Sequence, residues 1–128
     1  MGTRWVHEGP YAAHITPRPE PMAKLAPLLI EADHGMVWVS ECDGAIVGML
    51  GVVGTFHPYS GEPVMSEMFW YVEPEHRGQG VRLLKIAEDW ARANGIADSI
   101  MISPSEKVSN FYEKLGYRLL ETQYIKRL

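Results

Sequence analysis

A polar turn with two glycines, Arg77-Gly78-Gln79-Gly80, stands directly before an amphipathic helix. The start of a helix leaves backbone N–H groups without partners, and a Ser, Thr, Asp or Asn side chain usually caps them. None of these residue types occurs from Arg77 to Val81. Unpaired N–H groups and the positive end of the helix dipole together favour an anion. The turn therefore predicts a site for a phosphate-bearing ligand, with a plain polar connection between strand and helix as the alternative.

One carboxylate interrupts an apolar run that has the composition of a strand. Val64 to Val72 reads VMSEMFWYV, and Glu67 is its single acidic residue. Burial disfavours the charged form of a carboxylate and raises its pKa towards neutrality, as a general base requires. Glu67 is therefore the candidate base, with an ion pair to an Arg or Lys as the alternative. Glu73 and His57 are reserve candidates: a histidine has an intrinsic pKa suited to a base, with a merely solvated loop histidine as the alternative, and a chain of water molecules could also serve.

Composition limits the classes of protein to which the chain can belong. Its 128 residues, 46% hydrophobic and 22% charged, predict one globular domain over residues 1–128. A net charge of −4 argues against nucleic acid or an anionic membrane as the main partner. The single cysteine excludes an intrachain disulfide and favours a cytoplasmic location. No apolar run reaches ~18 residues, so no transmembrane helix is expected.

The elements that must position these residues follow from apolar spacing and turn formers. Residues 1–19 are expected to be irregular, because prolines interrupt them. Asp43-Gly44 is a two-residue hairpin signal. Strands are predicted at Met36–Glu41, Ala45–Phe56, Val64–Val72, Ser99–Ile102 and Tyr117–Leu128, the last as one strand or as two with a turn near Glu121-Thr122-Gln123. Helices are predicted at about Pro21–Ala32, Gly80–Asn94 and Val108–Leu115, and Pro104-Ser105-Glu106 has the pattern of a helix start before the last of them. This order predicts a mixed α/β domain with a hairpin first and a crossover later.

Two segments carry a resemblance to a known family. Residues 72–81 read V-E-P-E-H-R-G-Q-G-V, and residues 110–117 read N-F-Y-E-K-L-G-Y. In this order, and about thirty residues apart, they resemble the GNAT superfamily of N-acetyltransferases. The likeness covers about residues 35–128. It implies an α/β fold of the α+β type, in which helices flank a mixed, mostly antiparallel sheet with splayed central strands.

The chain departs from the family pattern in two places. Arg77, Gly80 and Arg82 fall on the three defined positions of the family motif Q/R-x-x-G-x-G/A. Arg82 stands where a small residue normally lets the helix approach the cofactor, and its side chain would either meet a phosphate or weaken binding. The first strand and one of two N-terminal helices are not evident, which predicts a reduced N-terminal region.

The resemblance implies acetyl-CoA as the cofactor. The glycine turn would hold the pyrophosphate, and the strand before it would bond the pantetheine arm where that strand splays from Ser99–Ile102. Ser105 stands at the position of an asparagine that contacts the arm in many family members. The residues implied in cofactor binding are Tyr71, Val72, Glu73, Arg77, Gly78, Gln79, Gly80, Val81, Arg82, Ser105 and Tyr112.

The resemblance also implies a reaction in which a primary amine of a small molecule or peptide attacks the thioester directly. Tyr112 aligns with the tyrosine that protonates the departing thiolate, and a tyrosine hydroxyl, with a pKa near ~10, stays protonated. Its alternative role is packing. No metal is predicted. Two other functions remain open: a catalytically inactive module that binds CoA or a nucleotide, and an interaction domain that forms a homodimer through the edge at Tyr117–Leu128.

Overall fold

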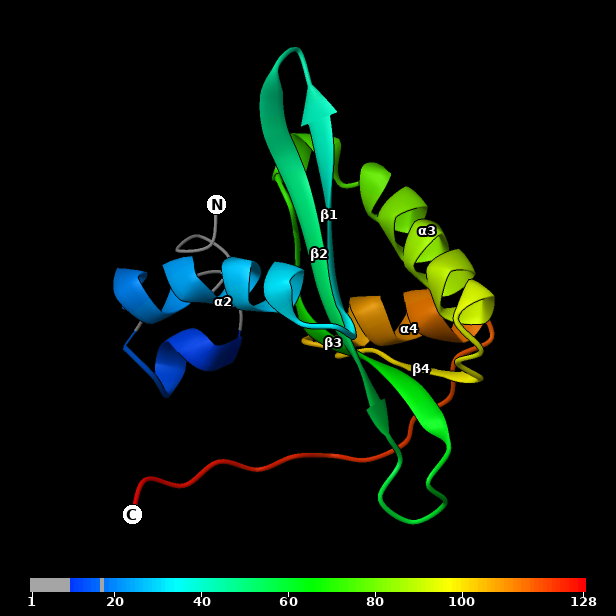
Figure 1. Ribbon diagram of the computed structural model, residues 1–128. Coiled ribbons are helices and arrows are strands. Elements are labelled where there is room, and N and C mark those ends of the chain that lie inside the picture. The colour runs from blue at the N-terminus through cyan, green and yellow to red at the C-terminus, as the bar shows by residue number, and fades with distance from the viewer. Residues whose placement is uncertain (1–9, 17) are drawn as a thin grey trace.

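The computed structural model describes residues 10–16 and 18–128 of the chain. The helices are η1 (Pro10–Ala13), α2 (Pro19–Glu31), η2 (Pro74–His76), α3 (Gln79–Ala93) and α4 (Glu106–Lys114). The strands are β1 (Gly35–Cys42), β2 (Ala45–Phe56), β3 (Pro63–Val72) and β4 (Asp98–Ile100). Figure 1 shows α2 on one side of the sheet and α3 and α4 on the other. The predicted arrangement of helices around a mixed sheet is therefore confirmed.

The four strands lie in the order β1-β2-β3-β4. β1, β2 and β3 pair antiparallel, and β4 pairs parallel to β3 after the chain has crossed over through α3. The predicted hairpin between β1 and β2 turns at Asp43 and Gly44, whose φ angles are 50° and 77°. Positive φ at both central residues matches the twist of the two flanking strands, which is why short polar residues and glycine occupy this turn.

The core lies mainly between the sheet and α3. Leu50 and Met65 of the sheet and Leu83 and Ala87 of α3 are almost fully buried in one cluster. Every third or fourth residue of α3 is apolar, so one face of the helix meets the sheet while charged residues face solvent. Leu29 of α2 is buried against the opposite face of the sheet, close to Gly51. The sheet is therefore covered on both faces.

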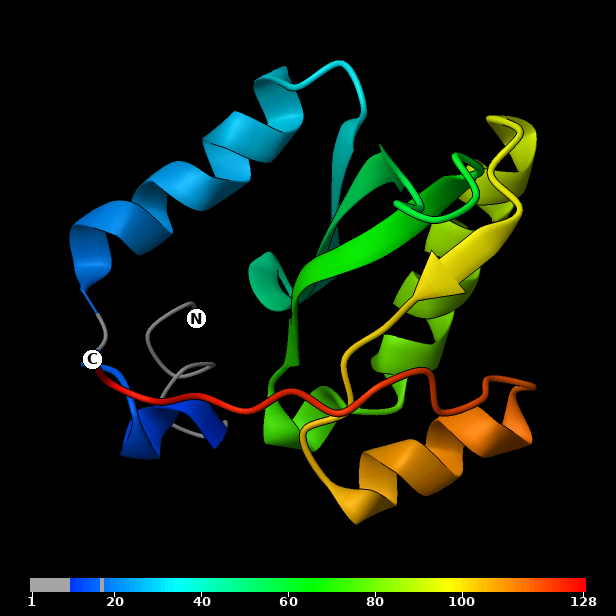
Figure 2. The same cartoon turned by 90° about the horizontal axis from the view of Figure 1, so that it is seen from below.

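β3 and β4 separate soon after they meet. Only three rungs join them, and the last pairs Ser66 with Ile100. β3 continues to Val72 without a β4 partner, and Figure 2 shows the chain leaving the short yellow β4 towards α4. This split confirms the splayed strands that the family resemblance implied, although β4 ends two residues earlier than predicted.

The prediction of a strand at Tyr117–Leu128 is wrong. The segment has no regular structure, and Figures 1 and 2 show it as an extended trace. A strand needs a neighbour that exchanges backbone hydrogen bonds, and among the described residues none exchanges such bonds with residues 118–128. Leu119 and Tyr124 are accordingly 84% and 95% exposed. The predicted pairing of this segment with a second copy lacks the strand on which it depends.

The N-terminal part is more regular than predicted. Of residues 1–19, which were expected to be irregular, residues 10–13 form η1 and Pro19 already belongs to α2. Proline is tolerated in the first turn of a helix because its missing N–H has no partner there. Residues 1–9 and 17 lie outside the described residues.

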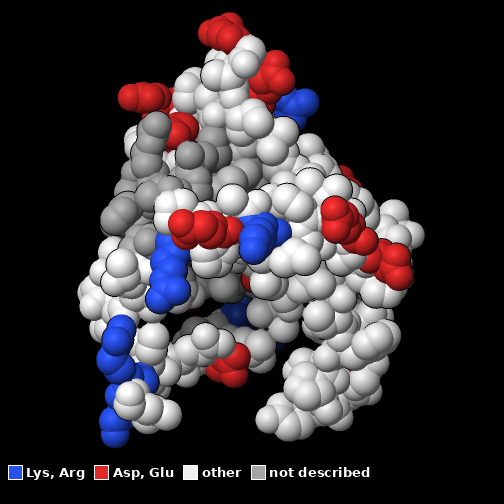
Figure 3. Space-filling view, turned by 60° about the vertical axis from the view of Figure 1, so that its left-hand side comes forward, with Lys and Arg blue, Asp and Glu red and all other residues white. Residues whose placement is uncertain are grey.

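The surface carries charges of both signs, and acidic and basic side chains both occur on the face drawn in Figure 3. Within residues 10–16 and 18–128, no helix combines the length and apolar character needed to cross a bilayer. The same residues contain no cluster of three or more His, Cys, Asp or Glu side chains suited to a metal ion.

Candidate active site

The N-terminal end of α3 is open to a ligand. Gly78 is the N-cap residue, and no side chain caps the helix. Arg77, Gly78 and Arg82 are exposed, and all lie within one turn of the helix start. The first backbone N–H groups of a helix and its dipole attract anions. The predicted turn residues are therefore gathered where an anion would bind, which suits the pyrophosphate role implied for them.

The two glycines of this turn serve different purposes. A Cβ atom on Gly78 would meet nothing within 4 Å, so the outer surface of the turn is clear. A Cβ atom on Gly80 would lie 3.2 Å from Cζ2 of Trp70. Gly80 therefore lets α3 pack closely on β3. The sequence motif indicated only the approach of a ligand and gave no sign of this packing role.

A bulge in β3 decides which way Glu67 faces. Val52 pairs with Glu67, whereas the adjacent Gly51 pairs with Phe69, so Met68 is an extra residue in the ladder. Residues opposite each other in a sheet share a face, and an extra residue shifts the alternation by one. Glu67 consequently lies on the face of Val52, which is covered by α3 and α4. Without the bulge it would lie on the other face, together with Phe69.

The surroundings of Glu67 suit a general base. Its Oε2 atom accepts a hydrogen bond from the amide of Ile102 at 3.0 Å. Burial raises the pKa of Glu67 to about 7, while the Ile102 amide and the Tyr112 hydroxyl favour the charged form and oppose that rise. Among the described residues no Arg or Lys forms an ion pair with this carboxylate. The geometry therefore favours the base over the ion-paired alternative.

Tyr112 lies beside Glu67 at the split between β3 and β4. It is 5% exposed, and its hydroxyl donates to the carbonyl of Ile102 at 3.3 Å. Its ring centroid lies 6.0 Å from that of Trp70 and 5.1 Å from that of Tyr117. Burial, reinforced by the charge of Glu67, raises the pKa of Tyr112, so its hydroxyl remains protonated. The two predicted catalytic side chains are brought together.

Ser105 has a local task besides the predicted one. Its hydroxyl accepts a hydrogen bond from the amide of Val108 at 3.4 Å, which caps α4. This cap agrees with the helix start predicted at Pro104-Ser105-Glu106, since α4 begins at Glu106. A Ser105 hydroxyl used as a cap retains lone pairs but is anchored at the helix start.

The alternation of β3 decides which backbone groups face the split. The amide of Glu73 bonds to the carbonyl of Val47 at 2.8 Å, so Glu73 points towards β2. Backbone groups of successive strand residues point to opposite sides. Tyr71 therefore also points to β2, whereas Val72 and Trp70 turn their N–H and C=O groups towards the split. Of the three predicted strand residues only Val72 faces it, and Trp70 was missed.

Comparison with known proteins identifies the family of the chain. Residues 4–117 match the family model described as Acetyltransferase (GNAT) family. The chain belongs to this family. N-acetyltransferase family 8 member 2 of Rattus norvegicus is 29% identical over 89 residues, which cover 66% of this chain and 39% of that protein. The chain thus spans about two fifths of the length of this relative.

Solved structures extend the GNAT comparison to nearly the whole chain. An acetyltransferase of Trypanosoma brucei is 26% identical, with a TM-score of 0.70 over 98% of this chain and 89% of that chain. AAC(6')-Iy in complex with the bisubstrate analogue CoA-S-monomethyl-acetylneamine has a TM-score of 0.72 over 98% of this chain and 90% of that chain. At 17% identity, the second likeness concerns the fold alone.

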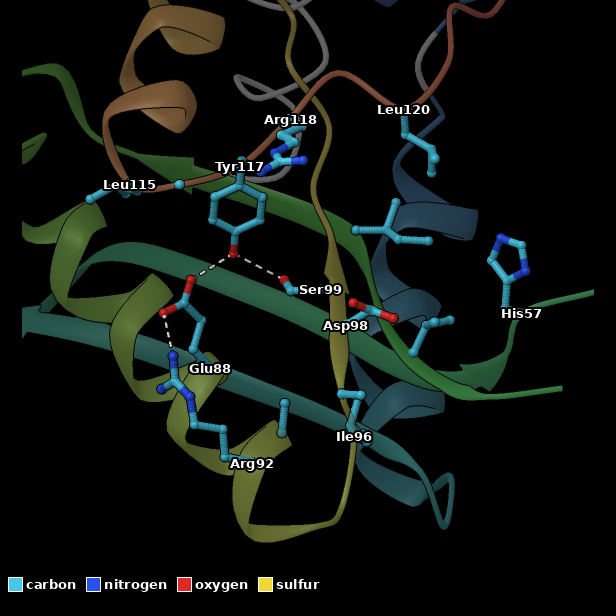
Figure 4. A pocket seen from close by; sticks show the side chains of 15 residues that line it. His57, Glu88, Arg92, Ile96, Asp98, Ser99, Leu115, Tyr117, Arg118 and Leu120 are labelled. Carbon is cyan, nitrogen blue, oxygen red and sulfur yellow. Dashed lines mark hydrogen bonds and ion pairs between the residues drawn. The ribbon is translucent and has the colours of Figure 1, made fainter. Parts of the chain in front are cut away.

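This GNAT chain has a further cavity of about 510 Å³ at the outer edge of β4 (Figure 4). The Tyr117 hydroxyl donates to Oε1 of Glu88 at 2.7 Å and is also hydrogen-bonded to Ser99 at 3.0 Å. Arg92 pairs with Glu88 at 3.4 Å. His57 lines this cavity, whereas Glu67, Tyr112 and the glycine turn do not. The reserve base His57 is therefore not brought to the candidate active site.

Proposed function

We propose that this GNAT protein is an N-acetyltransferase that moves an acetyl group from acetyl-CoA to a primary amine of a small molecule or peptide. The observation that carries the proposal is the convergence of Glu67 and Tyr112 on the point where β3 and β4 separate. One carboxylate that titrates near neutrality and one protonated hydroxyl are the acid and base that acetyl transfer to an amine requires.

The cofactor fits the open features of the chain. The uncapped start of α3, with Arg77 and Arg82 beside it, suits a pyrophosphate. The backbone groups of Val72 and Trp70 that face the split suit an amide-bearing arm, because unpaired groups in a sheet otherwise carry an energetic cost. When bound, acetyl-CoA supplies an acyl group activated as a thioester. An arm that runs from the turn along β3 leads to Glu67 and Tyr112.

Each side chain then has a proton to move. Glu67, with a pKa of about 7, accepts a proton from the amine nitrogen, which must be neutral when it attacks. The Tyr112 hydroxyl, held protonated by burial and by the Glu67 charge, donates its proton to the departing sulfur. Neither role needs a covalent link between the protein and the acetyl group, and the site offers no cysteine, because the single Cys42 lies on β1.

Gly78→Asp tests the cofactor site without disturbing the packing. Gly78 is exposed, and a Cβ there meets open space. An aspartate would place a negative charge at the start of α3 and repel a phosphate. Calorimetry should give micromolar binding of acetyl-CoA to the parent and binding weaker by at least about thirtyfold for the variant.

Ser60→Asp is the matched control, since Ser60 is exposed in the loop between β2 and β3, at the opposite end of β3 from the start of α3. It should bind acetyl-CoA as the parent does. Absence of binding to the parent at millimolar acetyl-CoA contradicts the proposal. If acetyl-CoA binds but no primary amine of a panel causes release of the CoA thiol, the result would instead favour the inactive CoA-binding module.

The cytoplasmic location, the homodimer and the absence of nucleic-acid and membrane partners remain predictions from the sequence. Sedimentation velocity of the purified chain tests the homodimer directly. Rates of CoA release with the panel of primary amines would measure which amine the protein prefers.

A further inference from the structure

Both backbone groups of Ile102 are satisfied by side chains. Its N–H donates to Oε2 of Glu67 at 3.0 Å, and its carbonyl accepts from the Tyr112 hydroxyl at 3.3 Å. Ile102 lies two residues beyond Ile100, where the last rung joins β4 to β3. In a continued ladder, backbone groups at such a position would bond to the neighbouring strand. Here two side chains, Glu67 of β3 and Tyr112 of α4, take the place of the β3 backbone.

The bulge at Met68 makes this substitution possible. It brings Glu67 to the same face as Trp70 and Tyr112, at the level where the rungs stop. The carboxylate therefore reaches the Ile102 amide from β3 itself, while Tyr112 reaches the carbonyl from α4. Side chains of two elements, β3 and α4, therefore meet at one residue that has no regular secondary structure.

We propose that Glu67, Ile102 and Tyr112 form a clip that fixes where β3 and β4 separate. The clip gives partners to both backbone groups of Ile102, so two hydrogen bonds hold the split before any ligand enters. It also prevents the two strands from pairing further, because the side chains occupy the positions of the missing rungs. Glu67 and Tyr112 thus act as positioning residues, in addition to the proton transfers proposed above.

The clip sets the inner end of the cofactor slot, an inference that rests on the proposed function. From Glu67 to Val72, β3 spans roughly 17 Å at about 3.3 Å per residue. An arm anchored at the start of α3 can extend along this length and no further, because the clip closes the slot. Its reactive end therefore stops between the carboxylate and the hydroxyl.

The clip and the base make different demands on residue 67. The clip needs only an acceptor for the Ile102 amide, which glutamine also offers through its amide oxygen. The base needs a titrating carboxylate. Glu67→Gln therefore retains the clip and removes the base, whereas Glu67→Ala removes both.

Hydrogen exchange at the Ile102 amide in the free protein tests the clip directly. Glu67→Ala should accelerate this exchange by about fivefold to tenfold, the effect of losing one net hydrogen bond, and Glu67→Gln should stay within about twofold of the parent. The amide of Glu73, bonded to Val47 at the other end of β3, is the internal control and should not change. Unchanged exchange at Ile102 in Glu67→Ala would overturn the proposal.

Acetyl-CoA affinity supplies the second readout. Glu67→Ala should bind at least about fivefold more weakly than the parent, and Glu67→Gln should bind like the parent although its turnover falls. Equal affinity of the alanine and glutamine variants contradicts the role of the clip in the slot. If the parent does not bind acetyl-CoA but Ile102 exchange responds as expected, the proposed function fails and the clip stands.

Tyr112→Phe keeps the test decisive if Glu67→Ala does not fold. The phenylalanine ring retains the contacts with Trp70 and Tyr117 and removes the hydroxyl, which donates to the Ile102 carbonyl and favours the charged form of Glu67. Exchange at Ile102 should again accelerate by about fivefold, with Glu73 unchanged. Exchange that equals the parent's at Ile102 in this variant would refute the contribution of Tyr112.

Discussion

Glu67 and Tyr112 influence each other's titration in opposite directions. The Tyr112 hydroxyl helps to keep Glu67 charged, whereas the charge of Glu67 adds to the burial that raises the pKa of Tyr112. Their pKa values are consequently far apart, one near neutrality and one above the usual range of tyrosine. Pairs of this kind separate the tasks of base and acid within one small site.

Glu67→Gln should abolish the ascending, acidic limb of the pH–rate profile. The base acts in its charged form, so kcat/KM of the parent should rise with pH and level off above a pKa of about 7. The variant should lose about a hundredfold in kcat and show no such rise. Glu113→Gln, an exposed acid next to Tyr112, is the control and should keep the parent's profile. A limb near pH 7 that persists in Glu67→Gln assigns the base elsewhere.

Tyr112→Phe should lower kcat by about tenfold to a hundredfold with the physiological thioester. An acetyl donor with an acidic aromatic thiol needs no proton on departure, so with that donor the loss should shrink. Initial rates with the two donors measure this difference. Tyr124→Phe, at a tyrosine that is 95% exposed, should change neither rate. An equal loss with both donors would assign Tyr112 to packing or to the clip alone.

Arg82 should strengthen cofactor binding despite its departure from the family motif. It is exposed in the first turn of α3, where its charge lies near the proposed pyrophosphate. Arg82→Ala should weaken acetyl-CoA binding by about fivefold at low salt, and the difference should fade at high salt because exposed charges are screened. Lys85→Ala, also exposed on α3, should bind almost as the parent does. Tighter binding by Arg82→Ala would show that the arginine obstructs the site.

Protein stability should depend on pH through Glu67. Burial raises its pKa from the ordinary value of 4.5 to about 7, so the folded state holds this proton more tightly than the unfolded chain. The stabilisation is fully present below a pH of about 4.5 and is lost as pH rises through about 7. Between these values the parent should lose up to about 3 kcal/mol of unfolding free energy relative to Glu67→Gln. Urea titrations across this range check the slope, and parallel curves for both proteins contradict it.

Gly51→Ala should destabilise the fold strongly. A Cβ atom there would lie 2.4 Å from Cζ of Phe69 and 2.9 Å from Cδ1 of Leu29, so a buried ring and its neighbour must move. Overpacking of this kind costs about 1–3 kcal/mol. Gly54→Ala on the same strand meets its nearest atoms at 3.5 Å, an ordinary contact, and should change stability by less than about 1 kcal/mol. Equal urea midpoints for the two variants would contradict this packing.

Local patterns predicted the elements that depend on local interactions. The hairpin at Asp43-Gly44 and the amphipathic α3 form where the sequence places turn formers and apolar repeats. The segment Tyr117–Leu128 has the same β-forming composition, yet it lacks a neighbour with which to pair. Composition reports which residues tolerate a strand, whereas the presence of a partner depends on the rest of the fold.

The candidate site was predictable in its side chains and not in its backbone. Glu67 was predicted as the base because it is an isolated acid in an apolar run, and Tyr112 was predicted as the proton donor from the family resemblance. The bulge at Met68 left no sign, because apolar residues suit either face of a central strand. The role of Ile102 could not be predicted from its residue type either, since it contributes a backbone amide and a backbone carbonyl, which almost every residue possesses.

The order of the strands has a consequence for how the molecule assembles. β1, β2 and β3 form an antiparallel meander with short connections, so their contacts close small loops and form early. β4 pairs with β3 only across the longer loop that contains α3, and three residue pairs offset the entropy cost of closing that loop. We expect the part of the chain around β4 and α4 to fold last and to open first. The proposed cofactor slot lies between β3 and this part of the chain that folds last. A bound cofactor would therefore stabilise the region that otherwise opens first.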